Sequence, residues 1–339
     1  MNRTMITKTA DRALKSKVFL RKAMNLPAKL QKQMVISFPI TMLLGFLFGH
    51  YFNAEALSGI ILPMTFLMVY PNMVGLDFKR LLSPGDSKLQ VITQAFNFLV
   101  YPLIAYGLGL IFFANSPILR LGLFMTSLFP TSGMTIAWVN MVKGNLPSAV
   151  KMTVIGLLTG SLLAPFYMQF AFGKSIDLPM GKTISQIALV VFLPMMAGLA
   201  TQKILIAKNG VQKFNQKIKP KIAPWSTMGV LGVQFAAMAL KADDLTAKPH
   251  LLLYLGIPIL TFYFLNFAIS TLVSRFFKER SDGMAFIYGS ALRNLPIALA
   301  IAMAVLGCDG AEVTILISLG FIIQAQMAAW HVKWMKKSR

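Results

Sequence analysis

The sequence predicts an all-α membrane protein with ten transmembrane helices. Of its 339 residues, 56% are hydrophobic and only 13% are charged, and the mean hydropathy is +0.65. A typical soluble domain carries about 25% charged residues. Apolar stretches recur along nearly the whole chain and leave no segment large enough for a water-facing domain. These observations exclude a soluble monomer.

Ten apolar runs approach the length that a helix needs to cross the hydrocarbon core, about 20 residues. Spans of this length form helices, because lipid offers no partners to an exposed backbone, and the alternating pattern of a barrel strand is absent. The predicted spans are 34–52, 57–77, 89–114, 118–142, 147–172, 184–204, 223–241, 249–274, 283–307 and 312–333.

The net charge of +22 is large enough to suggest a nucleic-acid binder, but the positions of the charges argue against one. Lys and Arg fall almost entirely in the short segments between spans. With the N-terminal tail placed inside, the inner segments carry 26 of them and the outer segments 5; Lys151 and Arg293 lie within spans. The positive-inside rule then predicts a multi-pass protein of the plasma (inner) membrane with both termini cytoplasmic. Its expected partner is the lipid bilayer, not nucleic acid.

Residues 1–33 form a basic segment without an apolar run long enough for a cleavable signal, so we expect a cytoplasmic tail. An amphipathic piece from Phe19 to Met34 is suited to the inner leaflet, where anionic lipids attract Lys and Arg.

Arg293 is the one charged residue deep within the ninth span. A guanidinium at that depth is costly, so it should face the bundle interior and mark an anion site or a cavity lined by carbonyls. A packing role or snorkelling is the alternative. Pro296 removes a backbone donor, and Gly289 loosens the preceding turn, so the sequence predicts a broken helix there.

The fourth span carries a matching interruption at Pro130 and Gly133. Shifting the chain by 163 residues places Pro130 on Arg293, so the two interruptions coincide. Five spans per half would enter the membrane in opposite directions, which gives an inverted repeat with its substrate site at the broken helices. The predicted parts are 34–172 (first repeat), 173–183 (external connection) and 184–335 (second repeat).

Several function classes are disfavoured by what the spans lack. No Asp or Glu lies near the middle of any span, the three His residues lie near span ends, and Cys308 is the single cysteine. Proton relays and metal sites need clusters of such groups, and an enzyme needs a nucleophile with a base or paired carboxylates. We therefore expect no metal and no catalysis. A receptor that binds without translocation stays open as an alternative.

Four segments of the spans have a distinctive order and spacing: residues 67–78, 97–102, 130–145 and 294–302. Through them the chain resembles the bile acid:sodium symporter superfamily, in the branch near the arsenical-resistance (arsenite efflux) permeases, over about residues 34–335. This resemblance implies ten helices, interleaved panel and core domains, and crossed broken fourth and ninth helices that form the substrate site. It also implies alternating access by movement of the core against the panel.

Departures from that family bear on the substrate. The resemblance implies a Glu and a Gln in the ninth helix of sodium-coupled members, and this chain has Gly289 and Arg293 at those positions. A cationic Arg should repel Na⁺ and act as a tethered cation, so H⁺ or an exchanged anion is the expected driver and no cofactor is expected. Arsenite permeases share Asn97, but Thr131 and Pro296 replace their Cys and Glu. Loss of the thiolate argues against arsenic.

The function that these residues predict is secondary active transport of a small organic anion, a carboxylate or sulfonate, by alternating access. The alternative is an arsenite or metalloid efflux permease. Thr153 is a weak site candidate, because it can bond back to its own helix. The predicted substrate-binding residues are Asn97, Thr131, Ser132, Thr135, Asn140, Arg293 and Asn294.

Overall fold

The computed structural model describes residues 26–31, 33–76, 85–131, 133–176, 180–247, 250–306 and 310–337, and these residues form helices without a strand. Most of the predicted tail, the site candidate Ser132, part of the 173–183 connection and Cys308 lie outside the described residues. The helices of the first half are α2 (Met34–Tyr51), α3 (Ser58–Val74), α4 (Ser87–Ala95), α5 (Tyr101–Phe112), α6 (Pro117–Leu128), α7 (Gly133–Met141) and α8 (Leu146–Phe172). Those of the second half are α9 (Met180–Ile187), α10 (Leu193–Asn209), α11 (Val211–Lys213), α12 (Lys219–Ile222), α13 (Trp225–Leu240), α14 (Ala242–Ala247), α15 (Leu251–Ser274), α16 (Arg280–Ala291), α17 (Leu295–Leu306) and α18 (Gly310–Lys337).

Three wide π-helical turns join successive α-helices into longer rods. They are η3 (Phe96–Val100), η4 (Ala188–Phe192) and η5 (Phe214–Ile218), and each ends two residues before a proline, at Pro102, Pro194 and Pro220. Proline lacks an N–H and crowds the carbonyl four residues earlier, which lies inside the π turn in each case. The wider turn absorbs this clash without ending the rod.

Seven helices in the described part of the chain are long and apolar enough to cross a membrane, which agrees with a multi-pass membrane protein. Three shorter apolar helices, Ile36–Tyr51, Pro117–Leu128 and Leu295–Leu306, lie within the remaining predicted spans. Two of these three are short because their spans are interrupted, α6 before Pro130 and α17 after Arg293.

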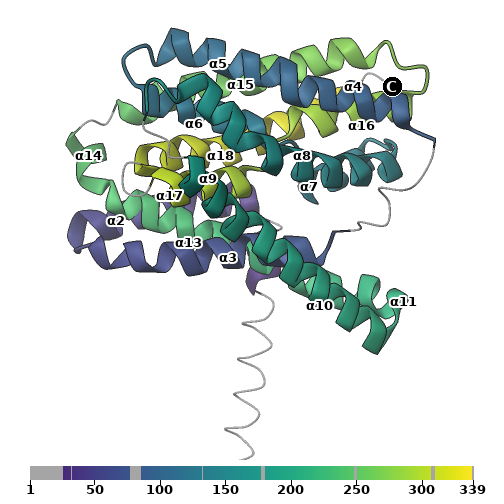
Figure 1. Cartoon of the computed structure of the whole chain (residues 1–339), viewed down its shortest axis with the longest axis horizontal. Coiled ribbons are helices and arrows are strands. Elements are labelled where there is room, and N and C mark those ends of the chain that lie inside the picture. Colours follow the sequence, from purple (N-terminus) through teal and green to yellow (C-terminus); the bar gives the residue numbers. More distant parts are fainter. Residues whose placement is uncertain are drawn as a thin grey trace, which may run out of the picture.

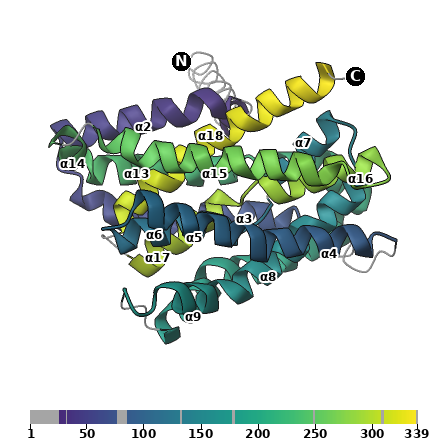
Figure 2. The same cartoon turned by 90° about the horizontal axis from the view of Figure 1, so that it is seen from above.

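The helices pack in two groups with different partners. In the first group α13 packs against α2 and α3, and α10 packs against α3 (Figure 1). Figure 2, which views the molecule from above, also shows α2 running alongside α13. The second group contains α4 to α8 and α15 to α18, in which α15 packs against α16 and α18, and α5 against α6. Both interrupted spans belong to this second group.

Candidate site at the crossing of two interrupted helices

The two interrupted spans meet where their backbones are extended. α6 ends two residues before Pro130, and α16 ends two residues before Arg293. An isolated antiparallel bridge pairs Pro130 with Arg293, so each break is tied to the other. These are the two residues that the 163-residue shift superposes, and the predicted interruptions and their crossing are present.

Two backbone hydrogen bonds hold this bridge. The Thr131 N–H donates to the Leu292 carbonyl at 3.0 Å, and the Asn294 N–H donates to the Phe129 carbonyl at 2.7 Å. Adding 163 to Phe129 and Thr131 gives Leu292 and Asn294, so the shift converts one bond into the other. Buried backbone groups need such partners, and each break here supplies them to the other.

The Arg293 side chain ties the same two breaks together. It is fully buried, and its Nη1 donates to the Ser127 carbonyl at 3.1 Å while Nη2 donates to the Ser290 carbonyl at 2.6 Å. Ser127 and Ser290 are again 163 residues apart. The guanidinium carbon lies 4.7 Å from the centre of the Tyr101 ring, at a distance typical of a cation–π contact.

Four helix ends determine the electrostatics of the crossing. The C-terminal ends of α6 and α16 bring partial negative charge, and the carbonyls that receive Arg293 belong to their last turns. The N-terminal ends of α7 and α17 bring partial positive charge to the other side of each break. Because Arg293 neutralises the two negative ends, the remaining field at the crossing favours an anion.

Arg293 keeps unused donors for such an anion. A guanidinium has five N–H groups, and the buried Nε has no hydrogen-bond partner in the part of the chain that the structure describes. Among the described residues no Asp or Glu pairs with Arg293; the ion pair seen within them joins Lys151 to Asp86 at 2.8 Å. A buried charge without a counter-ion is costly, so the unused donors point to a site for an anion.

Gln324 of α18 holds the Arg293 backbone in place. Its Oε1 accepts from the Arg293 N–H at 2.6 Å, and its Nε2 donates to the Arg293 carbonyl at 3.3 Å. The side chain is 3% exposed. One amide therefore satisfies both backbone groups that the break would otherwise leave unpaired.

The predicted site residues fall into two sets. Asn97, Thr131 and Thr135 are fully buried, and Asn294 is half-buried at the bridge. Asn140, by contrast, is exposed near the far end of α7, about two helical turns from the break.

Asn97 and Thr131 both have distinctive environments. Asn97 lies in the π turn η3, where Nδ2 donates to the Gly289 carbonyl at 3.1 Å. Its buried Oδ1 has no partner among the residues that the structure describes. Thr131 has a φ of +59°, which is strained for a β-branched residue, and its Oγ1 donates to the Pro130 carbonyl at 2.7 Å. The Thr153 hydroxyl donates to the Ala149 carbonyl of its own helix at 2.9 Å, which is the bond within the helix that made it a weak site candidate.

Sequence reasoning missed several polar residues around Arg293. Besides Gln324, α15 brings Tyr263, Asn266 and Ser270 into the interior, all fully buried, and the Tyr101 hydroxyl lies 2.6 Å from Ser270 Oγ. Asn266 and Gln324 each stand within an apolar span, which indicates that each needs a polar partner but not what that partner is.

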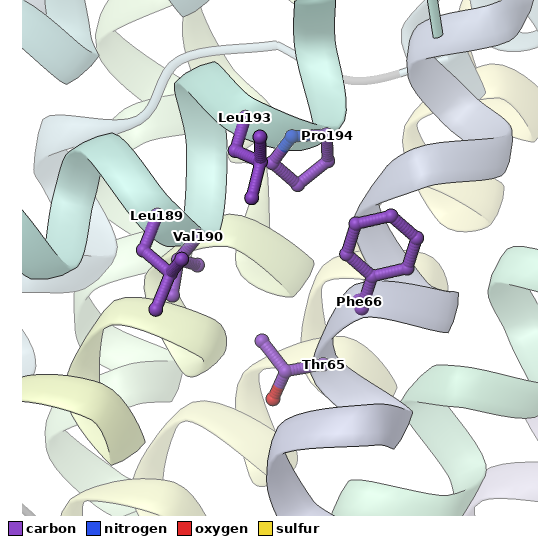
Figure 3. A pocket seen from close by; sticks show the side chains of 6 residues that line it. All are labelled: Thr65, Phe66, Leu189, Val190, Leu193 and Pro194. Atoms are coloured by element: carbon purple, nitrogen blue, oxygen red, sulfur yellow. The ribbon is translucent and has the colours of Figure 1, made fainter. Parts of the chain in front are cut away.

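A separate apolar pocket of about 140 Å³ lies between α3 and the η4–α10 rod. Figure 3 shows that its lining consists of apolar side chains apart from Thr65. Phe66, Leu189 and Leu193 are more than 40% exposed, so the pocket lies on the apolar outer surface of the protein. It offers no charge to an anion and suits an acyl chain better.

Comparisons with known proteins identify the family of the chain. The chain is 22% identical to the arsenical-resistance protein Acr3 of Corynebacterium glutamicum, over 77% of this chain and 75% of that protein. It is 19% identical to Acr3 of Alkaliphilus metalliredigens, over 81% of each chain, and 20% identical to the uncharacterized protein YbaS of Bacillus subtilis, over 86% and 92%. The model of the sodium bile acid symporter family matches residues 62–248, more than half of the chain, and the protein therefore belongs to this family of membrane transporters.

Proposed function

We propose that this transporter moves a small organic anion, a carboxylate or sulfonate, by secondary active transport, with Arg293 as the group that pairs with it. The observation that carries the proposal is a fully buried guanidinium that has an unpartnered Nε and no carboxylate partner among the described residues. An anion that accepts from the unused N–H groups would supply the missing counter-charge. Asn97, Thr131, Ser132, Thr135, Asn140 and Asn294 complete the proposed substrate-binding set, and Asn140 has the weakest support because it is exposed near the far end of α7.

We further propose that transport does not depend on Na⁺. A cation is already present where the carbonyls of Ser127 and Ser290 converge, and it belongs to the protein. A second cation at these carbonyls would meet the like charge of Arg293. The driver would then be H⁺ or an exchanged anion.

The proposed architecture is ten crossings in two inverted repeats within the plasma membrane, with both termini cytoplasmic. Its support is the 163-residue relation, which connects Phe129 with Leu292, Thr131 with Asn294, and Ser127 with Ser290 at the crossing. Broken helices at corresponding positions are typical of substrate sites in transporters with inverted repeats.

The test is uptake into proteoliposomes of a panel of small carboxylates and sulfonates and of arsenite, each with and without a Na⁺ gradient. We expect saturable uptake of at least one anion, unchanged by Na⁺. Arg293→Gln should lower that uptake at least 100-fold, and Arg293→Lys less, because Lys keeps the charge but loses the planar fork. Arg120→Gln, on α6 outside the break, is the matched control and should retain uptake. Equal anion uptake by Arg293→Gln and the parent would contradict the proposal.

The second candidate function is efflux of arsenite, and the two Acr3 relatives favour it. Arsenous acid is neutral at physiological pH, so it requires no counter-charge from Arg293. No group of His, Cys, Asp or Glu suited to a soft metal occurs among the described residues. Movement of arsenite without any organic anion in the same assay would select this function over the first.

A further inference from the structure

A second set of unpartnered polar atoms lies on α15. Asn266 is fully buried, yet neither its Nδ2 nor its Oδ1 has a hydrogen-bond partner among the described residues. The hydroxyl of Tyr263, also fully buried, has none either. Buried polar atoms in native proteins nearly always have a hydrogen-bond partner. Tyr263 and Asn266, one helical turn apart, together have three buried atoms without one, which indicates that a bound molecule supplies their partners.

These atoms face the region of the crossing. Residues 263, 266 and 270 follow one face of α15, because they are three and four positions apart. On this face, Ser270 Oγ lies 3.0 Å from Ser290 Oγ, in the residue whose carbonyl receives Arg293.

The other end of this face also borders the crossing. A Cβ added at Gly320 would lie 3.7 Å from the Tyr263 ring and 3.3 Å from Leu295 at the start of α17, two residues after Arg293. Asn266 therefore lies between two residues that border the anion site.

The chemistry of the unsatisfied atoms indicates what they bind. The Asn266 amide has an acceptor oxygen and a donor NH₂ group, and the Tyr263 hydroxyl can donate or accept a hydrogen bond. A carboxylate oxygen only accepts, so it would leave Asn266 Oδ1 unpaired. A hydroxyl group both donates and accepts, so it can satisfy the amide on both sides.

We infer that Asn266 and Tyr263 form a subsite for a hydroxyl group of the substrate, next to the anion site of Arg293. The substrate class is then a small hydroxy acid. This inference rests on the proposed anion transport, which supplies the other end of the same molecule. A site built to bond a hydroxyl strongly rejects an analogue without it, because its polar groups stay unpaired.

The test is competition in proteoliposomes between butyrate and its 2-hydroxy and 3-hydroxy derivatives. We expect at least one hydroxy acid to be preferred over butyrate at least tenfold. Asn266→Leu should reduce that preference to about onefold, because the amide that tells the hydroxy acids from butyrate is gone. Asn72→Leu changes the same residue type on α3, where the amide donates to the Met68 carbonyl of its own helix, and should keep the preference.

Two results would overturn the inference while the proposed function stands: equal uptake of all three acids, or a preference that survives Asn266→Leu. Uptake of none of these acids and of no anion in the wider panel of carboxylates and sulfonates would instead contradict the proposed function. The melting temperature of ligand-free Asn266→Leu protein decides the inference in that case. It should equal or exceed that of the parent, because Leu removes unpaired polar atoms. A drop of several degrees would mean that the amide already has partners and would overturn the subsite.

Discussion

At the scale of single residues, the sequence predicts the two helix breaks because the residues at them are unusual in a membrane helix. Arg293 carries a charge, and Pro130 and Pro296 lack the backbone N–H that a helix needs. Asn266 and Gln324 could not be assigned in this way, because a neutral amide within a span is ordinary when a neighbouring helix supplies its partner. Only the packing distinguishes Gln324, whose amide bonds the backbone of the break, from Asn266, whose amide has no partner among the described residues.

Gln324→Leu should destabilise the protein, since it leaves the N–H and the carbonyl of Arg293 buried and unpaired. Each such group costs about 1–3 kcal/mol. Thermal unfolding in detergent measures the loss, and Gln326→Leu, a half-buried change two residues along α18, is the matched control. Equal melting temperatures of the two variants would contradict the role assigned to Gln324.

At the scale of elements, the interrupted helix α6–α7 depends on close packing against α8. A Cβ at Gly160 would lie 2.7 Å from the Leu128 carbonyl, and one at Gly156 would lie 2.9 Å from Pro130. These two glycines, one turn apart, let the helix pass directly under the break. The sequence predicts that the break exists, but the partner helix that supports it depends on the packing of residues distant in sequence.

A partly buried ion pair fixes the start of α4 to α8. Lys151 Nζ donates to Asp86 Oδ1 at 2.8 Å, and Gln90 Nε2 donates to Asp86 Oδ2 at 2.7 Å. Burial opposes ionisation of Asp86, but the hydrogen bonds from Lys151, Ser148 and Gln90 and the charge of Lys151 outweigh it and lower the pKa below its ordinary 3.8. Lys151, one of two cations predicted within spans, therefore has a carboxylate partner, which Arg293 lacks among the described residues.

This lowered pKa predicts how stability responds to acid. Asp86 stabilises the fold above its unfolded pKa of about 3.9, and that contribution is lost as the pH falls through the lower folded pKa. Asp86→Asn should therefore unfold more easily than the parent at pH 6, and the difference should shrink below pH 4. Melting temperatures measured from pH 3 to 7 test this, with the exposed Asp243→Asn as control. A difference that does not change with pH would contradict the assignment.

At the scale of the whole molecule, close backbone packing occurs within each helix group. Gly45 and Gly49 of α2 approach α13, and Gly229 of α13 approaches α3, so the first group is tightly joined. In the second group Gly122 of α6 approaches α18 in the same way. Among the described residues, no glycine approaches a helix of the other group. We propose that the two groups are the bodies that move against each other in the proposed alternating access.

A cross-link between the groups should stop transport, whereas one within a group should not. Phe38 of α2 and Phe321 of α18 belong to different groups, and their ring centres lie 4.9 Å apart. In a protein carrying Cys308→Ser, Phe38→Cys with Phe321→Cys, bridged by a short bis-methanethiosulfonate that forms a disulfide with each thiol, should lose uptake. It should regain uptake when a reductant cleaves the two disulfides. The control pair is Phe48→Cys with Phe235→Cys, within the first group at a similar ring separation of 5.5 Å. It should transport when bridged, because that link joins helices that move together. Continued uptake by fully bridged Phe38→Cys and Phe321→Cys protein would show that α2 and α18 keep their contact throughout the transport cycle. The surface at which the two bodies slide would then lie between other helices.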